Sequence, residues 1–485
     1  MTLTHTPIRG IGRALPRTAV AFVAAVITCA ALAVTAPFAV ASEGQLDPTF
    51  GNNNGLELSP TDISSGAPEV YSPAIGNPSE TAALSGGGFP VFRLTIFGAD
   101  GRTVVADNLG ASSATVQNVT PVALVPMADG LYMAVGHQHA SDGSNEIVLG
   151  RFNANGSPDG GFGLQVVPET QCPGHAGGPG FGNIPTAAAF NGNRLVVVGS
   201  CGLGAGLGEQ PAAWEFNEQG QLLATHTLLS VTANSLPPGF STEDHFHATA
   251  ITAGRGSDYY VVGDFEGTRD GKDTDAIFLA KYIGGQGFDW TFGDSVPADP
   301  ANAGYELFGL GAANTAFFNG VDGATAVTMD WRDGGFPIVA GFSQGADGSA
   351  FAIARFTPAG APDTSFGTGD QRVIPIGTPS PTTIAQADAV AVRSDGEIYL
   401  SGTVLNYDGG DNDNLAVVRL GPTGQDDDTF GVNDNGQAVY PVPSGQFVVG
   451  PGALSMQSNG FPLIAQDGQI GSSNDPEFVL ARLTS

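Results

Sequence analysis

The sequence predicts an all-β protein: a closed β-propeller of seven four-stranded blades, with six or eight as the alternatives, in which the N-terminal segment completes the last blade. Three observations lead to this prediction. A short turn string recurs with a period of about 60 residues, and each period holds four short β-rich runs. The chain also stops before its last period is complete, while the region near residue 46 begins with the missing parts.

The recurring string has the form Asp-x-x-Phe-Gly. Successive copies place their phenylalanines 112, 130, 74 and 64 residues apart, at Phe50, Phe162, Phe292, Phe366 and Phe430. The first two intervals are about twice the last two, so each contains one degenerate copy. A fixed period of this length is typical of folds in which every repeat forms one small supersecondary unit.

Residues 387–442 show one complete period. Its β-rich runs, 387–394, 397–402, 415–420 and 437–442, are separated by tight turns and one polar loop. Four such strands form a small twisted antiparallel sheet. Because that sheet has two apolar faces and cannot bury both alone, copies are expected to pack face to face around an axis, as the blades of a propeller do.

The third strand of the period can be counted seven times. The last copy ends at Ser485 without the turn and fourth strand that should follow. Both are present near the N-terminus, so residues 46–58 are expected to complete the last blade and leave no open sheet edge. The seven expected third strands are 91–96, 146–152, 211–216, 276–282, 351–356, 415–420 and 477–483.

Six of these third strands end in a basic residue followed by an apolar one. In four complete copies an aspartate of the turn lies eight residues further on, and the copy that has Glu215 at the basic position also lacks the turn aspartate. We therefore expect a charge-assisted contact between strand end and turn, with the turn phenylalanine between blades, and a structural role for both residues. The expected pairs are Arg151 with Asp159, Lys281 with Asp289, Arg355 with Asp363, Arg419 with Asp427, and Arg482 with Asp47 across the chain ends.

These turns, the Asp-Gly before a strand that ends in Gly, and the strand that ends in Arg-Phe or Arg-Leu together resemble the delta-60 repeat proteins. That family is a group of bacterial chains also described as a β-propeller domain of unknown function. The resemblance covers most of residues 44–485 and is most specific in the copies that end at residues 163, 367 and 431. It implies the fold and an exported bacterial setting, and it brings no activity or catalytic residues.

The first 41 residues are expected to be a signal peptide. Arg9, Arg13 and Arg17 precede an apolar run from residue 18 to 36, and Ala39-Val40-Ala41 fits a cleavage site after Ala41. A retained membrane anchor is the alternative. The mature chain, residues 42–485, is then expected to be periplasmic or secreted, with no membrane span of its own.

The mature chain is strongly acidic. Loss of three arginines and no acid changes the net charge from −30 to −33. A chain with this charge is not expected to bind nucleic acid. Two cysteines remain, Cys172 and Cys201, in one repeat. An oxidising compartment permits a structural disulfide between them, with two thiols as the alternative.

No established catalytic motif is present in the sequence. Two His-x-His pairs, His137 with His139 and His245 with His247, could each offer two imidazoles to one metal if they lie on strands, although surface histidines are the default interpretation. Acidic loops can hold calcium, with solvated turns as the alternative, and no other cofactor is expected. These loops are 142–146, 270–275, 408–413 and 474–477.

Two classes of function follow from these patterns. The first is a monomeric binding or scaffold module of the envelope or the extracellular space, with a protein or a glycan as partner. The alternative is a propeller enzyme, a lyase or hydrolase, with a site at the channel mouth near the two histidine pairs. The expected first strands, such as residues 388–392 and 323–327, are mostly small and apolar, which favours binding or architecture over catalysis.

Overall fold

The structure is a computed structural model of the 485-residue chain, which divides into two units, Met1–Ala41 and Ser42–Ser485. The expected signal peptide, residues 1–41, lies outside the described residues. The description covers residues 43–51, 55–60, 69–71, 81–86, 91–98, 100–110, 116, 119–127, 129–168, 182–202, 209–227, 240–269, 272–293, 304–311, 322–345, 347–378, 380–407, 414–431, 435–441, 446–457, 459–470 and 476–484.

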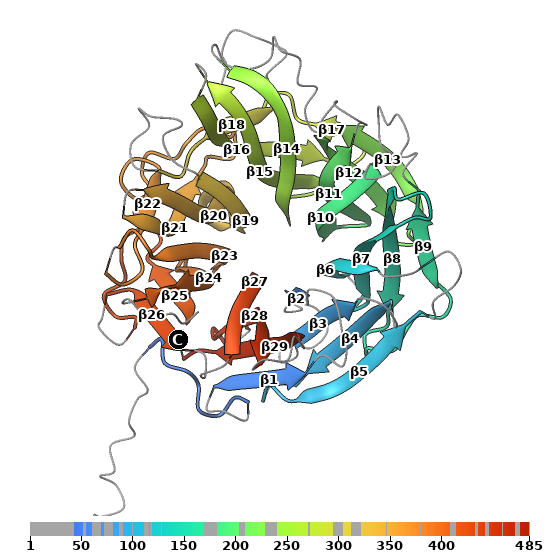
Figure 1. The fold of residues 1–485 in the computed structure, drawn as a ribbon, viewed down its shortest axis with the longest axis horizontal. Coiled ribbons are helices and arrows are strands. Elements are labelled where there is room, and N and C mark those ends of the chain that lie inside the picture. The colour runs from blue at the N-terminus through green and yellow to red at the C-terminus, as the bar shows by residue number, and fades with distance from the viewer. Residues whose placement is uncertain are drawn as a thin grey trace, which may run out of the picture. The chain divides into compact units, whose positions relative to one another are not determined.

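The described strands fall into seven groups along the chain, numbered here sheets 1 to 7 (Figure 1). Sheet 1 holds β2 (Glu69–Tyr71), β3 (Thr81–Gly86), β4 (Phe92–Phe97) and β5 (Thr103–Leu109). Sheet 2 holds β6 (Thr120–Pro126), β7 (Tyr132–His139), β8 (Asn145–Phe152) and β9 (Leu164–Val167). Sheet 3 holds β10 (Gly182–Asn191), β11 (Arg194–Gly202), β12 (Glu209–Asn217) and β13 (Leu222–Thr227).

Sheet 4 holds β14 (Phe240–Ala253), β15 (Asp258–Arg269) and β16 (Lys272–Ile283), with β17 (Gly287–Phe288) and β18 (Tyr305–Phe308) both paired to β16. Sheet 5 holds β19 (Asp322–Asp330), β20 (Phe336–Gly345), β21 (Gly348–Arg355) and β22 (Gln371–Ile374), with the 3₁₀ turn η2 (Arg332–Gly334) between its first two strands. Sheet 6 holds β23 (Ile384–Val392), β24 (Ile398–Leu405), β25 (Asn414–Leu420) and β26 (Gln437–Pro441). Sheet 7 holds β27 (Gln446–Met456), β28 (Pro462–Ile470), β29 (Pro476–Arg482) and β1 (Leu56–Pro60).

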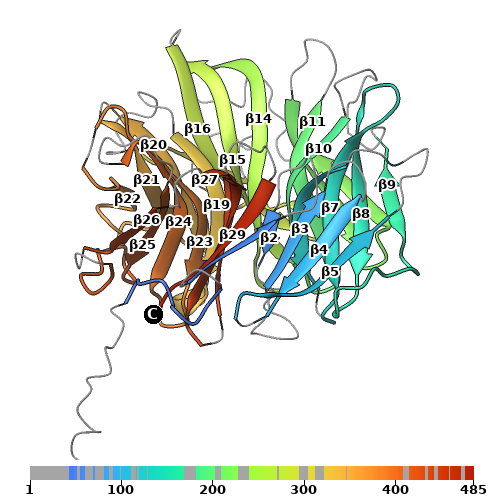
Figure 2. The ribbon, with the colours of Figure 1, turned by 60° about the horizontal axis from the view of Figure 1, so that its bottom comes forward.

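The fold is all-β, as predicted, and each expected third strand overlaps an observed one: β4, β8, β12, β16, β21, β25 and β29. The three long strands of sheet 4, β14 to β16, extend past their neighbours (Figure 2). Two parallel single-residue pairings, Gly182 with Asn145 and Glu209 with His245, join sheets 2, 3 and 4 into one 13-stranded sheet. Within the described part of the chain, no sheet closes on itself and no helix has the length and apolar character to cross a bilayer.

Sheet 7 is built from both ends of the chain. Strand β1 pairs antiparallel with β29, with Leu56 opposite Ala481 and Pro60 opposite Glu477 (Figure 1). An isolated bridge also joins Leu46 to Leu483, as Leu420 is bridged to Asp426 in sheet 6. The N-terminal segment therefore occupies the fourth-strand position of sheet 7, and β29 is not an edge strand.

The first strands of successive sheets contact one another. The contacting pairs are β2 with β6, β6 with β10, β10 with β14, β14 with β19, β19 with β23, β23 with β27, and β27 with β2. The contacts therefore run through all seven sheets and return from the last to the first.

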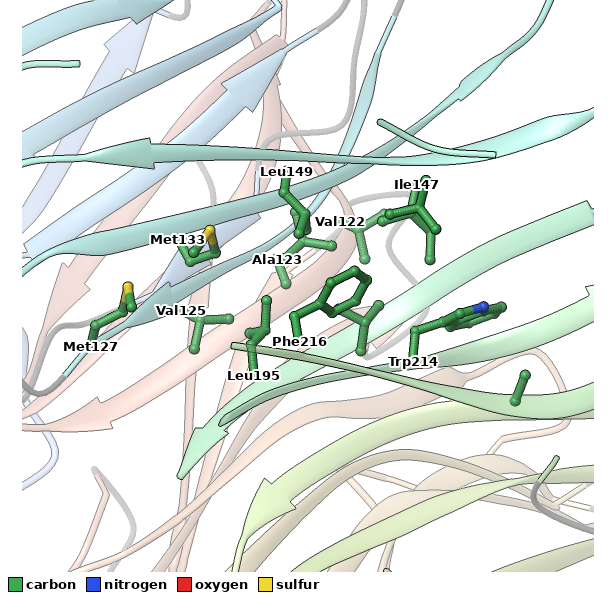
Figure 3. Close-up of a cluster of buried hydrophobic side chains, with 14 of the residues drawn as sticks. Val122, Ala123, Val125, Met127, Met133, Ile147, Leu149, Leu195, Trp214 and Phe216 are labelled. Atoms are coloured by element: carbon green, nitrogen blue, oxygen red, sulfur yellow. The ribbon is translucent and has the colours of Figure 1, made fainter. Parts of the chain in front are cut away.

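Apolar side chains fill the spaces between neighbouring sheets. In the cluster of Figure 3, Met133 and Leu149 of sheet 2 pack with Leu195 and Phe216 of sheet 3, and all four are buried. The cluster of Phe50, Phe97, Leu463, Ala465 and Leu480 joins sheet 7 to sheet 1 in the same manner. This packing covers the apolar faces that a single four-stranded sheet cannot bury alone.

A glycine in the second strand lets the first strand approach closely in five sheets. A Cβ built on Gly402 would lie 2.0 Å from the backbone oxygen of Gln386 in β23. The same contact would be 1.9–2.6 Å at Gly136, Gly199, Gly263 and Gly341. Real Cβ atoms do not approach backbone this closely, so these positions require glycine.

Gly402→Ala is expected to lower the free energy of unfolding by about 1–3 kcal/mol, because β23 and β24 must separate to admit the methyl group. Gly160→Ala is the matched control, since a Cβ there would meet nothing within 4 Å. Urea denaturation of both variants measures the difference. Equal midpoints for the two variants would show that the close approach is not required.

Candidate functional site

The first strands of sheets 3 to 7 line a partly open cavity of about 240 Å³, called here the inner cavity. It is lined by β10, β14, β19, β23 and β27. Its apolar lining consists of small or short side chains, including Ala187, Ala250, Ala326, Val390 and Leu454. The polar side chains of the lining belong to Thr186, Thr249, Thr325 and Asp388, so among the described lining residues Asp388 is the one ionisable group.

These four polar residues occupy equivalent places. Each stands at a β-bulge in the first strand of its sheet, as Thr325 does between Ala324 and Ala326. A bulge turns one extra side chain out of the regular pairing, here toward the cavity. The repeat therefore presents one polar side chain to the cavity from each of sheets 3, 4, 5 and 6.

The three threonine hydroxyls contact backbone oxygens of two sheets. Thr249 Oγ1 lies 3.3 Å from the oxygen of Val262 in its own sheet and 2.8 Å from that of Ala324 in sheet 5. Thr186 makes the equivalent contacts with Val198 and Ala248, and Thr325 with Ala340 and Ala387. A hydroxyl has one hydrogen to donate, so each of these groups can only accept from a molecule in the cavity.

In sheet 6, Asp388 stands at the position of the threonine. Its carboxylate accepts hydrogen bonds, whereas the threonine hydroxyls donate them. Its Oδ2 accepts from Gln466 Nε2 at 2.9 Å and from Thr403 Oγ1 at 3.3 Å, and its Oδ1 accepts from Gln386 Nε2 at 2.9 Å. Gln466 belongs to sheet 7. Counted from the turn glycines Gly396 and Gly460, it stands where sheet 6 has Gly402. At the junction of sheets 6 and 7, Gln466 thus takes the place of the glycine, and Asp388 takes the place of the threonine, that other repeats have.

The carboxyl of Asp388 titrates closer to neutral pH than an ordinary aspartate does. Burial raises its pKa to about 6, although the hydrogen bonds from Gln466, Gln386 and Thr403 favour the ionised form. None of these three donors carries a charge, which is why they only partly offset the loss of hydration.

The stability contributed by Asp388 is expected to fall as the pH rises. Its folded pKa lies above the ordinary value of 3.8, so the native state binds this proton more tightly than the unfolded state. That contribution is complete below about pH 4 and is lost as the pH rises through about 6. The stability of the protein relative to Asp388→Asn should therefore fall by about 2 kcal/mol between pH 4 and pH 7. Urea unfolding of both proteins at each pH measures this, and a pH-independent difference would contradict it.

The predicted pairs of strand-end base and turn aspartate lie in contact. The N–O distances are 2.7 Å for Arg151–Asp159, 3.4 Å for Lys281–Asp289, 2.7 Å for Arg355–Asp363, 2.7 Å for Arg419–Asp427 and 2.8 Å for Arg482–Asp47. In the Asp427 pair, burial alone would raise the carboxyl pKa, but hydrogen bonds from Thr429 and Arg419 outweigh it and hold that pKa below its ordinary value. These aspartates are therefore ionised partners of the cations at neutral pH.

The turn phenylalanine packs beneath the same arginine. The Cζ atom of Arg419 lies 4.9 Å from the ring centroid of Phe430, and that of Arg482 lies 4.7 Å from the ring of Phe50. Each ring also lies against a turn glycine of the following sheet, Gly44 for Phe430 and Gly101 for Phe50. The unit of arginine, aspartate and phenylalanine therefore connects neighbouring sheets.

The contact between sheets 7 and 1 follows the same pattern as the others. The amide of Gly51 donates to the backbone carbonyl oxygen of Asp100 at 2.7 Å. The amide of Gly367 donates to the backbone carbonyl oxygen of Thr423 in the next sheet at 2.8 Å. The amide of Gly293 makes this bond to Ala359 at 2.8 Å. The junction where the chain ends meet thus repeats the bond made at continuous junctions.

Sheet 3 replaces this unit with one that the sequence pattern did not reveal. Glu215, which stands where other repeats have the base, is fully buried and forms an ion pair with Arg194 of β11. Tyr282 of sheet 4 donates its hydroxyl to Glu215 Oε2 at 2.9 Å. The charge is reversed and the base comes from the second strand, which an eight-residue spacing cannot indicate.

Within the described residues, the two histidine pairs are not part of a metal centre. The rings of His137 and His139 lie 6.2 Å apart on β7, and burial, together with His139, lowers the pKa of His137. His245 and His247 are on β14, two sheets away, and the side chain of His245 lies outside the described residues. Among the described residues, no three His, Cys, Asp or Glu side chains are grouped to hold a metal ion.

The predicted cysteine pair and the acidic loops proposed for calcium lie only partly within the described residues. Cys201 is buried and disulfide-bonded, and Cys172 lies outside the described residues, so their pairing stays a prediction. Of the acidic loops proposed for calcium, residues 142–146 are described, and there Asp142 accepts from the hydroxyl of Ser144 at 2.7 Å. Residues 408–413 and parts of the two other loops are outside the description.

The successive groups of antiparallel strands and the contacts repeated between them are those of a β-propeller. Residues 128–162 and 338–366 match the model of a family described as a domain of unknown function (DUF5122) beta-propeller. Both segments include a third strand and its Asp-x-x-Phe turn. These two segments are therefore similar to the repeat of this propeller family of unknown function, which is consistent with the resemblance to the delta-60 repeat proteins. No curated protein matches the sequence.

Several solved structures are distantly similar. An alpha-L-arabinanase of Penicillium chrysogenum is 12% identical with a TM-score of 0.42, over 79% of this chain and 98% of its own. The β-propeller domain of the Trilobed protease of Pyrococcus furiosus is 9% identical with a TM-score of 0.40, over 85% and 93%. A protein of unknown function from Dyadobacter fermentans is 10% identical with a TM-score of 0.40, over 92% and 98%.

Proposed function

We propose that residues 42–485 form a closed seven-bladed propeller that is exported and acts as a binding or scaffold module. The closed ring is supported by the pairing of β1 with β29 and by the contact of β27 with β2. Export is supported by the signal-like pattern of the first 41 residues.

The residues that line the inner cavity favour a binding role over a catalytic one. Hydrolysis of a glycosidic bond ordinarily requires two carboxyl groups about 5–10 Å apart, one as acid and one as nucleophile or base. The described cavity lining offers Asp388 alone, surrounded by threonines and alkyl groups. This arrangement can hold a ligand but provides no partner for acid–base chemistry.

A protein or glycan partner is favoured by exposed aromatic side chains on the turns. Trp290 is 52% exposed in the Asp-x-x-Phe-Gly turn of sheet 4, and Trp331 is 48% exposed between β19 and β20. Arg255 of sheet 4 lies over the Trp331 ring at 5.7 Å. Exposed tryptophans are common anchors in binding surfaces because they offer a large rigid contact area.

Two measurements test this proposal. The purified chain 42–485 should hydrolyse nitrophenyl glycosides and arabino-oligosaccharides no faster than Asp388→Asn does, and turnover abolished by that substitution would overturn the binding role. Used as bait in the secretome of its source, the chain should retain a partner that Trp290→Ser/Trp331→Ser loses. Retention of the same proteins and glycans by both baits would exclude this surface.

A further inference from the structure

We propose that the inner cavity binds a small organic cation, a protonated primary amine, whose ammonium group is held by Asp388. This rests on the proposed binding role and names the ligand class for the cavity. The proposal stands on the placement of one buried carboxylate in a wall that is otherwise apolar or accepts hydrogen bonds.

One oxygen of the Asp388 carboxylate has a single side-chain donor. Each carboxylate oxygen offers about two acceptor positions, the described side-chain donors to Asp388 are three, and the backbone of Thr403 also stabilises its ionised form. Oδ2 receives two of them and Oδ1 receives one, from Gln386. Since Asp388 is also part of the cavity lining, Oδ1 can accept a hydrogen bond from a bound molecule.

The ligand is expected to be positively charged. The side chains bonded to Asp388 are two amides and one hydroxyl, and no other ionisable side chain is among the described residues that line the cavity. The negative charge is therefore not neutralised by a neighbour. A ligand cation would do so beside a buried carboxylate, where the attraction is stronger than in water. The net charge of −30 for the whole chain adds to this preference.

The other polar groups of the wall favour a molecule with several donors. The hydroxyls of Thr186, Thr249 and Thr325 all face backbone oxygens, which leaves their own oxygens as acceptors. An ammonium group has three hydrogens to donate and no acceptor. A carboxylate or phosphate ligand would meet only acceptors here and would be repelled by Asp388.

The rest of the wall distinguishes an alkylamine from a metal ion. Calcium takes six to eight oxygen ligands, usually including several carboxylates, and one aspartate does not provide them. The methyl and methylene groups of Ala250, Ala326, Val390 and Leu454 instead suit a short alkyl chain. The cavity volume of about 240 Å³ has room for one.

The experiment titrates butylammonium chloride into chain 42–485 in phosphate buffer at pH 8, followed by calorimetry and ligand-observed NMR. We expect saturable binding that is at least tenfold weaker for Asp388→Asn and unchanged for Asp428→Asn, an exposed aspartate outside the cavity. n-Butanol, the neutral analogue, should bind at least tenfold more weakly than butylammonium. Binding should also weaken at least tenfold between pH 8 and pH 5, as Asp388 takes up its proton.

Three results would overturn the proposal: no binding of butylammonium, equal binding of butanol, or binding of calcium chloride in place of the amine with the same dependence on Asp388. Circular dichroism establishes whether Asp388→Asn is folded. If it is not, Asp388→Thr, which introduces the residue of the three neighbouring sheets, and the pH series on the unaltered protein decide the matter. Failure of amine binding would leave the turnover and partner measurements unaffected, so the two proposals are tested separately.

Discussion

A chain that begins at residue 61 is expected to lose most of its stability relative to one that begins at residue 42. The deletion removes β1 from β29 and exposes that strand as an open edge. It also removes Phe50, which is 1% exposed, from the cluster that joins sheets 7 and 1. Loss of one buried phenylalanine side chain costs about 3–5 kcal/mol. With the strand pairing added, the loss approaches the total stability of a typical domain, about 5–15 kcal/mol.

Urea denaturation and amide hydrogen exchange measure this effect. Exchange should accelerate first in β28 and β29, which are more than 400 residues from the deletion in sequence. Addition of a synthetic peptide of residues 43–60 should restore protection by supplying the missing strand in trans. The point variant Phe50→Ala should give an intermediate loss. An unchanged midpoint and unchanged exchange in β29 would rule out a structural role for the N-terminal segment.

Arg419→Leu is expected to lower the free energy of unfolding by about 3–5 kcal/mol, because it leaves partly buried carboxylates without their cation. The side chain of Arg419 is 1% exposed, 2.7 Å from Asp427, 3.6 Å from Glu397 and in contact with Glu43. It also covers the ring of Phe430. The same residue therefore holds its own turn and the N-terminal segment of sheet 7.

The control for this prediction is Arg102→Ala. Arg102 and Asp100 form a pair at 3.9 Å whose side chains are 65% and 55% exposed, and such pairs contribute about 0–1 kcal/mol. Arg419→Lys should recover only part of the loss, since one ammonium group cannot replace the two guanidinium nitrogens of which Nε contacts Asp427 and Nη2 contacts Glu43. Below its melting temperature, Arg419→Leu should still bind butylammonium as the unaltered chain does. A loss of binding at an unchanged melting temperature would assign Arg419 to a ligand site.

Local patterns predicted the strands and the turn contacts well. The third strands overlap their expected positions, and the eight-residue spacing from Arg355 to Asp363 corresponds to a direct contact of 2.7 Å. These features succeed because strand, turn and ion pair all lie within one repeat. A residue and its partner eight positions away are fixed by the same hairpin geometry, so the sequence alone specifies them.

The inner cavity was not predicted, because its contacts join different repeats. Asp388 and Gln466 lie 78 residues apart, and residues 388–392 read as a small, apolar first strand. A comparison of repeats position by position would have found the pair: Asp388 stands where sheet 5 has Thr325, and Gln466 stands where sheet 6 has Gly402. Asp388 and Gln466 both depart from the repeat and face each other across two sheets. Inspection of one repeat alone therefore cannot reveal the pair.

The pairing of β1 with β29 also sets the order of events when the chain folds. Residues 56–60 are synthesised early but find their partners only at residues 477–481, after more than 400 further residues have been made. Closing so long a loop is slow compared with forming the hairpins inside each sheet. Six of the sheets can therefore form as the chain grows, while the seventh remains incomplete until both partners are present. Sheet 7 is thus completed late and in one step, and only after residues 477–481 have been synthesised.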